Sequence, residues 1–99
     1  MHEFELMLVI RPNLNEEELK QVIEKAEEYI SRVGGNVSKS ENWGLKHIAY
    51  EIEGFDKAYY ALIMYSAPYI SSKSLQEIVK EDEDVLRHMI IHKHQEDKD

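Results

Sequence analysis

The sequence predicts an α+β fold, in which a four-stranded antiparallel sheet carries two helices on one of its faces. Two observations predict this fold class. Apolar residues recur at every second position in four segments and at every third or fourth position in two others, in the order β-α-β-β-α-β. The chain has 99 residues and no cysteine, which suits one domain with a single core and no disulfide framework.

The first strand covers residues 1–10, and a helix follows over about residues 16–33. Pro12 ends the strand, and Asn15 with Glu18 matches the capping box that starts a helix. Alternation places four strand side chains on one face, namely Phe4, Leu6, Leu8 and Ile10. Helical spacing gives the apolar stripe Leu19, Val22, Ile23, Ala26, Ile30 and Val33. Gly34 can take the left-handed conformation that ends this helix.

The second half of the chain supplies two more strands, a shorter helix and a last strand. Their predicted ranges are 36–53 (bent near Trp43 and Gly44), 56–66, 69–80 and 85–93. The strand at 56–66 is apolar or aromatic on both faces, so we expect it in the middle of the sheet. Residues 81–84 read as a solvated acidic connection, and residues 94–99 as a polar, disordered tail.

Right-handed crossovers place the first and third strands centrally and both helices on the same side of the sheet. Residues 1–93 are therefore expected to form a single ferredoxin-like βαββαβ sandwich. Its other sheet face would expose apolar side chains drawn from Met7, Val9, Tyr60, Leu62, Met64, Met89 and Ile91.

The charge balance argues against a protein that binds nucleic acid on its own. The chain contains 12 Lys and Arg residues and 20 Asp and Glu residues, which give a net charge of −8. Proteins that bind nucleic acid on their own usually carry a basic surface. The cations, however, fall mainly in or beside the predicted strands, at Arg11, Lys39, Lys46, Lys57, Arg87 and Lys93. The absence of cysteine suits a reducing cytoplasm, and no apolar stretch is as long as a membrane span.

Catalytic and metal sites find little support in the residues. The sequence contains no GxSxG, Walker A, GxGxxG or HExxH run. The turn at Arg11 lacks the glycines of an anion-binding loop, so Arg11 is expected to be a solvated turn residue. His88, His92 and His94 share a strand face, but no cysteine accompanies them and a closed zinc site needs four ligands. We therefore expect no enzyme, no cofactor and no metal site.

The stretch from Trp43 to Ile52, WGLKHIAYEI, is the most informative part of the chain. Lys46 and His47 fall on opposite strand faces, and Trp43 and Tyr50 offer rings that can stack. From the residues alone, a partner-binding strand and an ordinary edge strand with solvated charges both remain open.

The run G-L-K-H-I-A-Y-x-I resembles the signature of the bacterial ribosomal protein S-six family. Further pieces follow in the family's order: the strand M-H-E-F-E leading to R-P-N-L, a Gly pair after the helix, and D-x-V-L-R-H-M near the end. The resemblance spans residues 1–93. It implies a structural constituent of the small ribosomal subunit, which binds the central domain of small-subunit ribosomal RNA as a heterodimer with the basic ribosomal protein S-eighteen.

Two sets of site residues are predicted. The RNA-binding set is Lys46, His47, Arg87, His92 and Lys93, and the partner-binding set is Trp43, Leu45, Tyr50, Tyr60 and Leu62. The sequence departs from the family where His47 replaces a basic residue and Glu51 a proline, and where His2 and Phe4 stand in place of Arg and Tyr. Contacts to the RNA backbone are expected rather than base stacking on Tyr59 and Tyr60.

Two other function classes remain open at this point. One is a homo-oligomeric regulatory domain of the same fold that binds a small ligand and pairs its open sheet face with a second copy. The other is a small hydrolase. A stable homodimer that binds a metabolite would favour the regulatory domain over the ribosomal protein.

Overall fold

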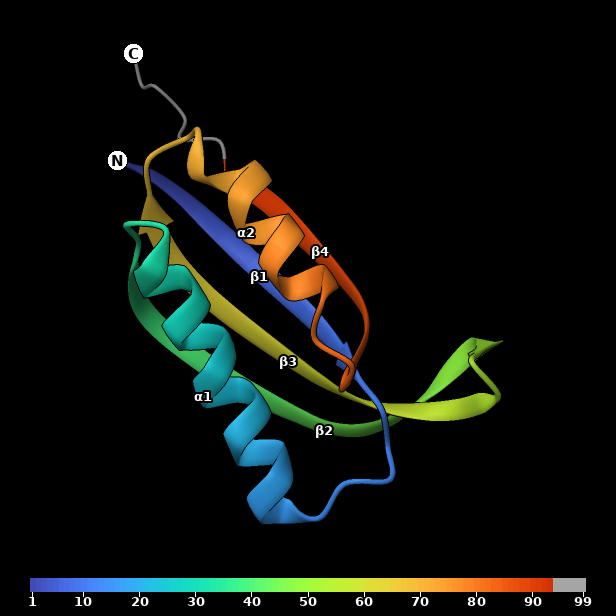
Figure 1. The fold of residues 1–99 in the computed structure, drawn as a ribbon. Coiled ribbons are helices and arrows are strands. Elements are labelled where there is room, and N and C mark those ends of the chain that lie inside the picture. The colour runs from blue at the N-terminus through green and yellow to red at the C-terminus, as the bar shows by residue number, and fades with distance from the viewer. Residues whose placement is uncertain (94–99) are drawn as a thin grey trace.

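The computed structural model describes residues 1–93, and it contains the six predicted elements in the predicted order (Figure 1). They are β1 (His2–Ile10), α1 (Glu16–Arg32), β2 (Asn36–Ile52), β3 (Phe55–Ala67), α2 (Ser71–Lys80) and β4 (Val85–Lys93). The expected tail at residues 94–99 lies outside the described residues. Within residues 1–93, no helix is both long and apolar enough to cross a bilayer.

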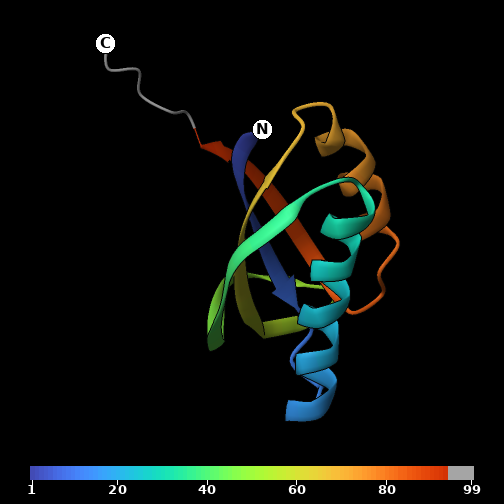
Figure 2. The same cartoon turned by 90° about the vertical axis from the view of Figure 1, so that its left-hand side faces the viewer.

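The four strands form one antiparallel sheet in the order β2-β3-β1-β4. The first and third strands are thus central, as predicted from right-handed crossovers. Both helices lie on the same side of the sheet (Figure 2). The fold is the predicted ferredoxin-like sandwich, with one sheet face left without a helix.

The core lies between the sheet and the two helices. Its β1 residues are the predicted alternate set Phe4, Leu6, Leu8 and Ile10, all at most 2% exposed. The stripe of α1 and the inner side of α2 cover them with Leu19, Val22, Ala26, Ile30, Leu75 and Val79. The capping box is present, because Glu18 N donates to Asn15 Oδ1 at 2.8 Å and Asn15 N donates to Glu18 Oε1 at 2.9 Å.

The hairpin of β2 and β3 extends beyond the end of β1. Ile10, the last residue of β1, pairs with Tyr59, whereas β3 already begins at Phe55. The register of β2 shifts between Asn42 and Gly44, where the bend was predicted, and Gly44 has φ of +84°. Figure 1 shows the tip of this hairpin projecting away from the helices.

The connection between α2 and β4 differs from the prediction, because its acidic residues are not simply solvated. Asp82 is only 8% exposed and accepts a hydrogen bond from the Tyr29 hydroxyl at 3.0 Å. Asp84 forms an ion pair with Arg11, with Nη2 and Oδ1 2.7 Å apart. The expectation of a solvated Arg11 is therefore also wrong. Both partners come from distant parts of the chain, which local sequence patterns do not reveal.

Candidate RNA and partner interface

The sheet face turned away from the helices, here called the open face, carries the apolar residues predicted for it from the sequence. Met7 pairs with Leu62 on β3 and with Met89 on β4, and Glu5 pairs with Met64 and Ile91. Paired residues point to the same side of a sheet, opposite to the buried set of β1. Met89 is 57% exposed and Ile91 is 40% exposed, and no element within residues 1–93 covers them.

Arg87 and Lys93 flank this apolar group on β4. They pair with Val9 and Glu3 of β1, so both belong to the open face. Lys93 Nζ lies 3.3 Å from Glu5 Oε2, and this ion pair offsets part of its charge. Arg87 is exposed and forms no ion pair within residues 1–93.

Lys46 and His47 lie on β2, at the opposite edge of the sheet from β4. Lys46 pairs with Ala58 and His47 with Lys57, in the part of the hairpin that extends past β1. Three strand spacings, about 14 Å, separate β2 from β4. The structure therefore does not gather the five predicted RNA-binding residues into one patch.

Three predicted partner-binding residues are well exposed on β2. Trp43 is 43% exposed, Leu45 49% and Tyr50 81%. The Trp43 indole Nε1 donates to Glu41 Oε1 at 2.9 Å. This hydrogen bond, followed by the one from Lys39, lowers the pKa of the Glu41 carboxyl and keeps a negative charge beside the indole.

The other two predicted partner-binding residues lie in the middle of the open face. Tyr60 is half-buried, and Leu62 is only 6% exposed because neighbouring strands surround it. Leu62 therefore offers little area to a partner, whereas Met89 and Ile91, outside the predicted set, offer more.

His92 occupies a different site from the other predicted RNA-binding residues. It pairs with Phe4, on the helix side of the sheet, and its ring lies against those of His2 and Tyr69. Tyr69 belongs to this group too, although no pattern in the sequence indicates it. Alternation along the strand relates His2 to Phe4, but only the fold brings the start of α2 beside them.

The histidines do not form a metal centre in the described chain. No group of three or more His, Cys, Asp or Glu residues within 1–93 is arranged to hold an ion. His88 is half-buried on the helix side of β4, where burial and then the Lys80 charge lower the pKa of its imidazole. His94 lies outside the residues that the structure describes.

Comparison with known proteins identifies the family. A family model described as "Ribosomal protein S6" matches residues 3–92. The small ribosomal subunit protein bS6 of Heliobacterium modesticaldum is 32% identical over 93 residues, covering 94% of this chain and 97% of that protein. The bS6 of Desulforamulus reducens is 33% identical over 91 residues, covering 92% and 96%.

A solved structure agrees with this assignment. The 30S ribosomal protein S6 of Thermotoga maritima superimposes with a TM-score of 0.87 at 27% identity, covering 93% of this chain and 87% of that one. Members of this family are structural, non-enzymatic parts of the ribosome, which confirms that the chain is not an enzyme and places it in the cytoplasm. The chain belongs to the ribosomal protein S-six family of the bacterial small ribosomal subunit.

Proposed function

We propose that this chain binds the central domain of small-subunit ribosomal RNA as one half of a heterodimer with the basic ribosomal protein S-eighteen. In this way it supports assembly of the small-subunit platform and translation. The observation that carries the proposal is the charge of the chain. A member of a ribosomal family with a net charge of −8 needs positive charge from a partner to stay on RNA.

The available cations set the strength of the RNA contact. Lys46 and Arg87 form no ion pair within the described chain, and His47, His92 and Lys93 are exposed. Three or four phosphate contacts correspond to a salt slope of about −3, or a loss of roughly 60-fold in affinity between 50 and 200 mM salt. The acidic remainder of the surface repels the polyanion further. We therefore expect weak RNA binding by the chain alone.

The partner contact would use apolar surface bordered by acid. Trp43, Leu45 and Tyr50 project from β2, and Tyr60 and Leu62 lie in the open face. Glu5 lies on the open face and Glu41 lies beside the Trp43 indole. Such carboxylates attract a basic protein, which raises its rate of association and favours it over acidic competitors. Exposed apolar side chains, those of Trp43, Leu45 and Tyr50 on β2 and of Met89 and Ile91 on β4, then supply most of the area that is buried.

A three-way binding experiment tests the proposal. The chain, ribosomal protein S-eighteen and an equimolar mixture are each titrated into a fluorescent central-domain RNA at about 150 mM salt, close to physiological ionic strength. We expect the mixture to bind more tightly than either protein alone, and the chain alone to bind weakly.

Two results would contradict the proposal. One is tight RNA binding by the chain alone at this salt concentration. The other is a stable homodimer that binds a metabolite and ignores ribosomal protein S-eighteen, which would support the regulatory-domain alternative. Analytical ultracentrifugation of the chain alone distinguishes that homodimer from a monomer.

A further inference from the structure

One end of the molecule carries a cluster of aromatic rings, here called the aromatic end and made of His2, Phe4, Tyr69 and His92. The Tyr69 ring centroid lies 5.4 Å from that of His2 and 5.2 Å from that of His92. His2 Nδ1 and His92 Nε2 are 3.0 Å apart, which ties the start of β1 to the end of β4. Figure 1 shows that α2 also starts at this end.

A hollow of about 620 Å³ opens between the aromatic end and the first turns of α2. Its volume lies within the range of sites that bind small organic groups. Tyr69 is 62% exposed. The hollow is lined in part by Phe4, Tyr69, Ser72, Lys73, Gln76 and His92.

Among residues 1–93, the lining of this hollow contains no Asp or Glu, which is unusual for a chain with a net charge of −8. The first turn of α2 also has no acidic residue and no side-chain cap, so the positive end of the helix dipole is not neutralised there. A second hollow, of about 550 Å³ between α1 and β2, shows the contrast. Its lining includes Glu16, Glu17, Glu24, Glu27 and Glu41.

We infer that the hollow at the aromatic end binds an unpaired nucleotide of RNA, with its base stacked on Tyr69 and its phosphate beside Lys73. This inference rests on the proposed function and adds a base-stacking contact to the backbone contacts proposed above. An unpaired base exposes its face to an aromatic ring, whereas a base within a duplex is already stacked on its neighbours.

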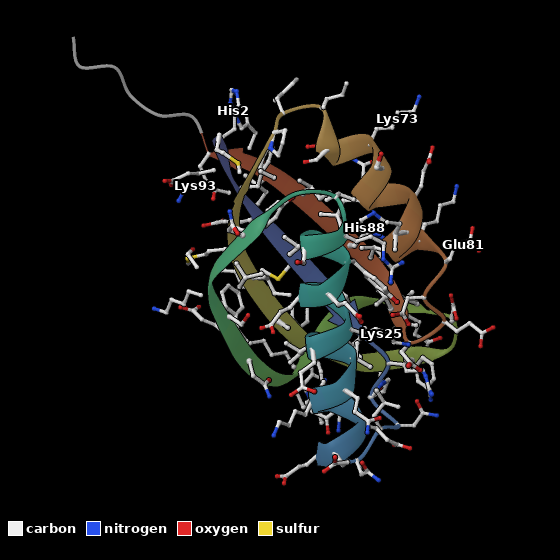
Figure 3. The ribbon with its side chains drawn as sticks, turned by 60° about the vertical axis from the view of Figure 1, so that its left-hand side comes forward. His2, Lys25, Lys73, Glu81, His88 and Lys93 are labelled. Atoms are coloured by element: carbon white, nitrogen blue, oxygen red, sulfur yellow. The ribbon has the colours of Figure 1, made fainter. Side chains whose placement is uncertain are left out.

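The side chains around Tyr69 suit the parts of a nucleotide. Ser72 and Gln76 are four residues apart on α2, so they share one helix face and can both hydrogen-bond to a base edge. Lys73 supplies an ammonium group for the phosphate. Figure 3 shows Lys73 and His2 at the same end of the molecule, with Lys93 nearby.

The test uses the heterodimer with ribosomal protein S-eighteen and measures its affinity for central-domain RNA. Tyr69→Leu removes the ring but keeps apolar bulk, and we expect about a 5- to 150-fold loss of affinity with an unchanged salt slope. Tyr69→Phe keeps the ring and should bind within about twofold of the unmodified complex, since every base stacks on either ring.

The charge contact has its own variant and a matched control. Lys73→Gln should make the salt slope less negative by about one unit, because one phosphate contact is lost. Lys20→Gln removes a lysine from the acidic hollow at α1 and should leave the slope unchanged. Thermal unfolding of each variant verifies that these exposed positions leave the fold intact.

The affinity of the unmodified complex separates failure of this inference from failure of the proposed function. If the unmodified complex binds RNA and the Tyr69→Leu and Lys73→Gln complexes bind it equally well, the nucleotide site is wrong and the proposed function stands. If the complex does not bind RNA, the proposed function is wrong.

A crosslinking experiment tests the hollow directly. Central-domain RNA carrying 4-thiouridine is irradiated in complex with the heterodimer, and crosslinks to the peptide that carries Tyr69 would support the site. The nucleotide site would be overturned by crosslinks only to other peptides, by the absence of crosslinks, or by evidence that the Tyr69 peptide contacts ribosomal protein S-eighteen instead of RNA.

Discussion

Tyr29 and Tyr65 both place a phenol ring against the core, but their hydroxyl groups are in different situations. The Tyr29 hydroxyl donates to the buried Asp82 carboxylate at 3.0 Å. The Tyr65 ring stacks on Phe4 with centroids 5.3 Å apart, and its buried hydroxyl has no hydrogen-bond partner within residues 1–93. Replacement of each tyrosine by phenylalanine therefore has opposite consequences.

We expect Tyr29→Phe to lower the free energy of unfolding by about 2 kcal/mol, because it leaves the Asp82 carboxylate with one hydrogen bond fewer in a buried site. Tyr65→Phe should leave that free energy unchanged or raise it by about 1 kcal/mol, because it removes a polar group without a partner. Urea unfolding followed by circular dichroism measures both changes. Equal destabilisation by the two variants would show that the Tyr65 hydroxyl is satisfied.

Because the pKa values of the same two tyrosines are raised, we expect the folded protein to lose stability at alkaline pH. Burial, and for Tyr29 also the hydrogen bond to Asp82, raises the pKa of each phenol from 10.0 to about 12. In the unfolded chain the phenols ionise near the ordinary value, so their contribution to stability is complete below pH 10 and is lost as the pH rises to about 12. Urea midpoints across this pH range should fall less steeply in a variant with both tyrosines replaced by phenylalanine. If the urea midpoint of the double variant falls as steeply with pH as that of the unmodified chain, groups other than these tyrosines cause the loss of stability.

At the scale of the element, the bulge in β2 determines how the exposed residues Trp43 and Leu45 are presented. Asn42 Oδ1 accepts a hydrogen bond from Gly44 N at 2.9 Å, and Gly44 has φ of +84°. Apart from Gly44 and its chain neighbours, no atom of residues 1–93 lies within 4 Å of the position that a Cβ on Gly44 would occupy. The requirement for glycine therefore comes from the backbone conformation and not from crowding.

We expect Gly44→Val to cost about 1–2 kcal/mol in the present conformation and so to favour another arrangement of the bulge. Affinity for ribosomal protein S-eighteen should fall, while hydrogen exchange in α1 stays unchanged because the apolar stripe of that helix packs in the core rather than on the bulge. Gly44→Asn is the matched control, since asparagine tolerates positive φ better than valine. Calorimetric titration with the partner gives the result. Native affinity in the valine variant would mean that the bulge plays no part in partner binding.

At the scale of the whole molecule, two of the predicted RNA-binding cations lie on opposite edges of the sheet. Lys46 lies on β2 and Arg87 on β4, and neither forms an ion pair within the described part of the chain. Lys93 is paired with Glu5. The RNA-binding cations predicted from the sequence therefore form no single basic patch.

We expect Lys46→Ala and Arg87→Ala each to make the salt slope of RNA binding by the heterodimer less negative by about one unit. Lys93→Ala should change the slope less, because Glu5 already offsets part of its charge. RNA titrations at several salt concentrations give the slopes. Unchanged slopes in both alanine variants would show that other cations make the phosphate contacts.

The sequence by itself determined the six elements, their order and the sheet topology. The alternation of Phe4 with Leu6 and the capping box of Asn15 and Glu18 are relations between residues near one another in the chain, and consecutive residues encode them directly. The family resemblance could likewise be read from one short run beginning at Gly44. Right-handed crossovers then left little freedom in how these elements assemble.

Only the tertiary structure decided which distant residues meet. It buried Asp82 against Tyr29, paired Arg11 with Asp84, and placed Tyr69 beside His92. It also separated Lys46 from Arg87, although both face the same side of the sheet. The physical reason is that periodicity is a local property of the chain. Contacts between segments depend on strand register and helix placement, which local periodicity does not specify.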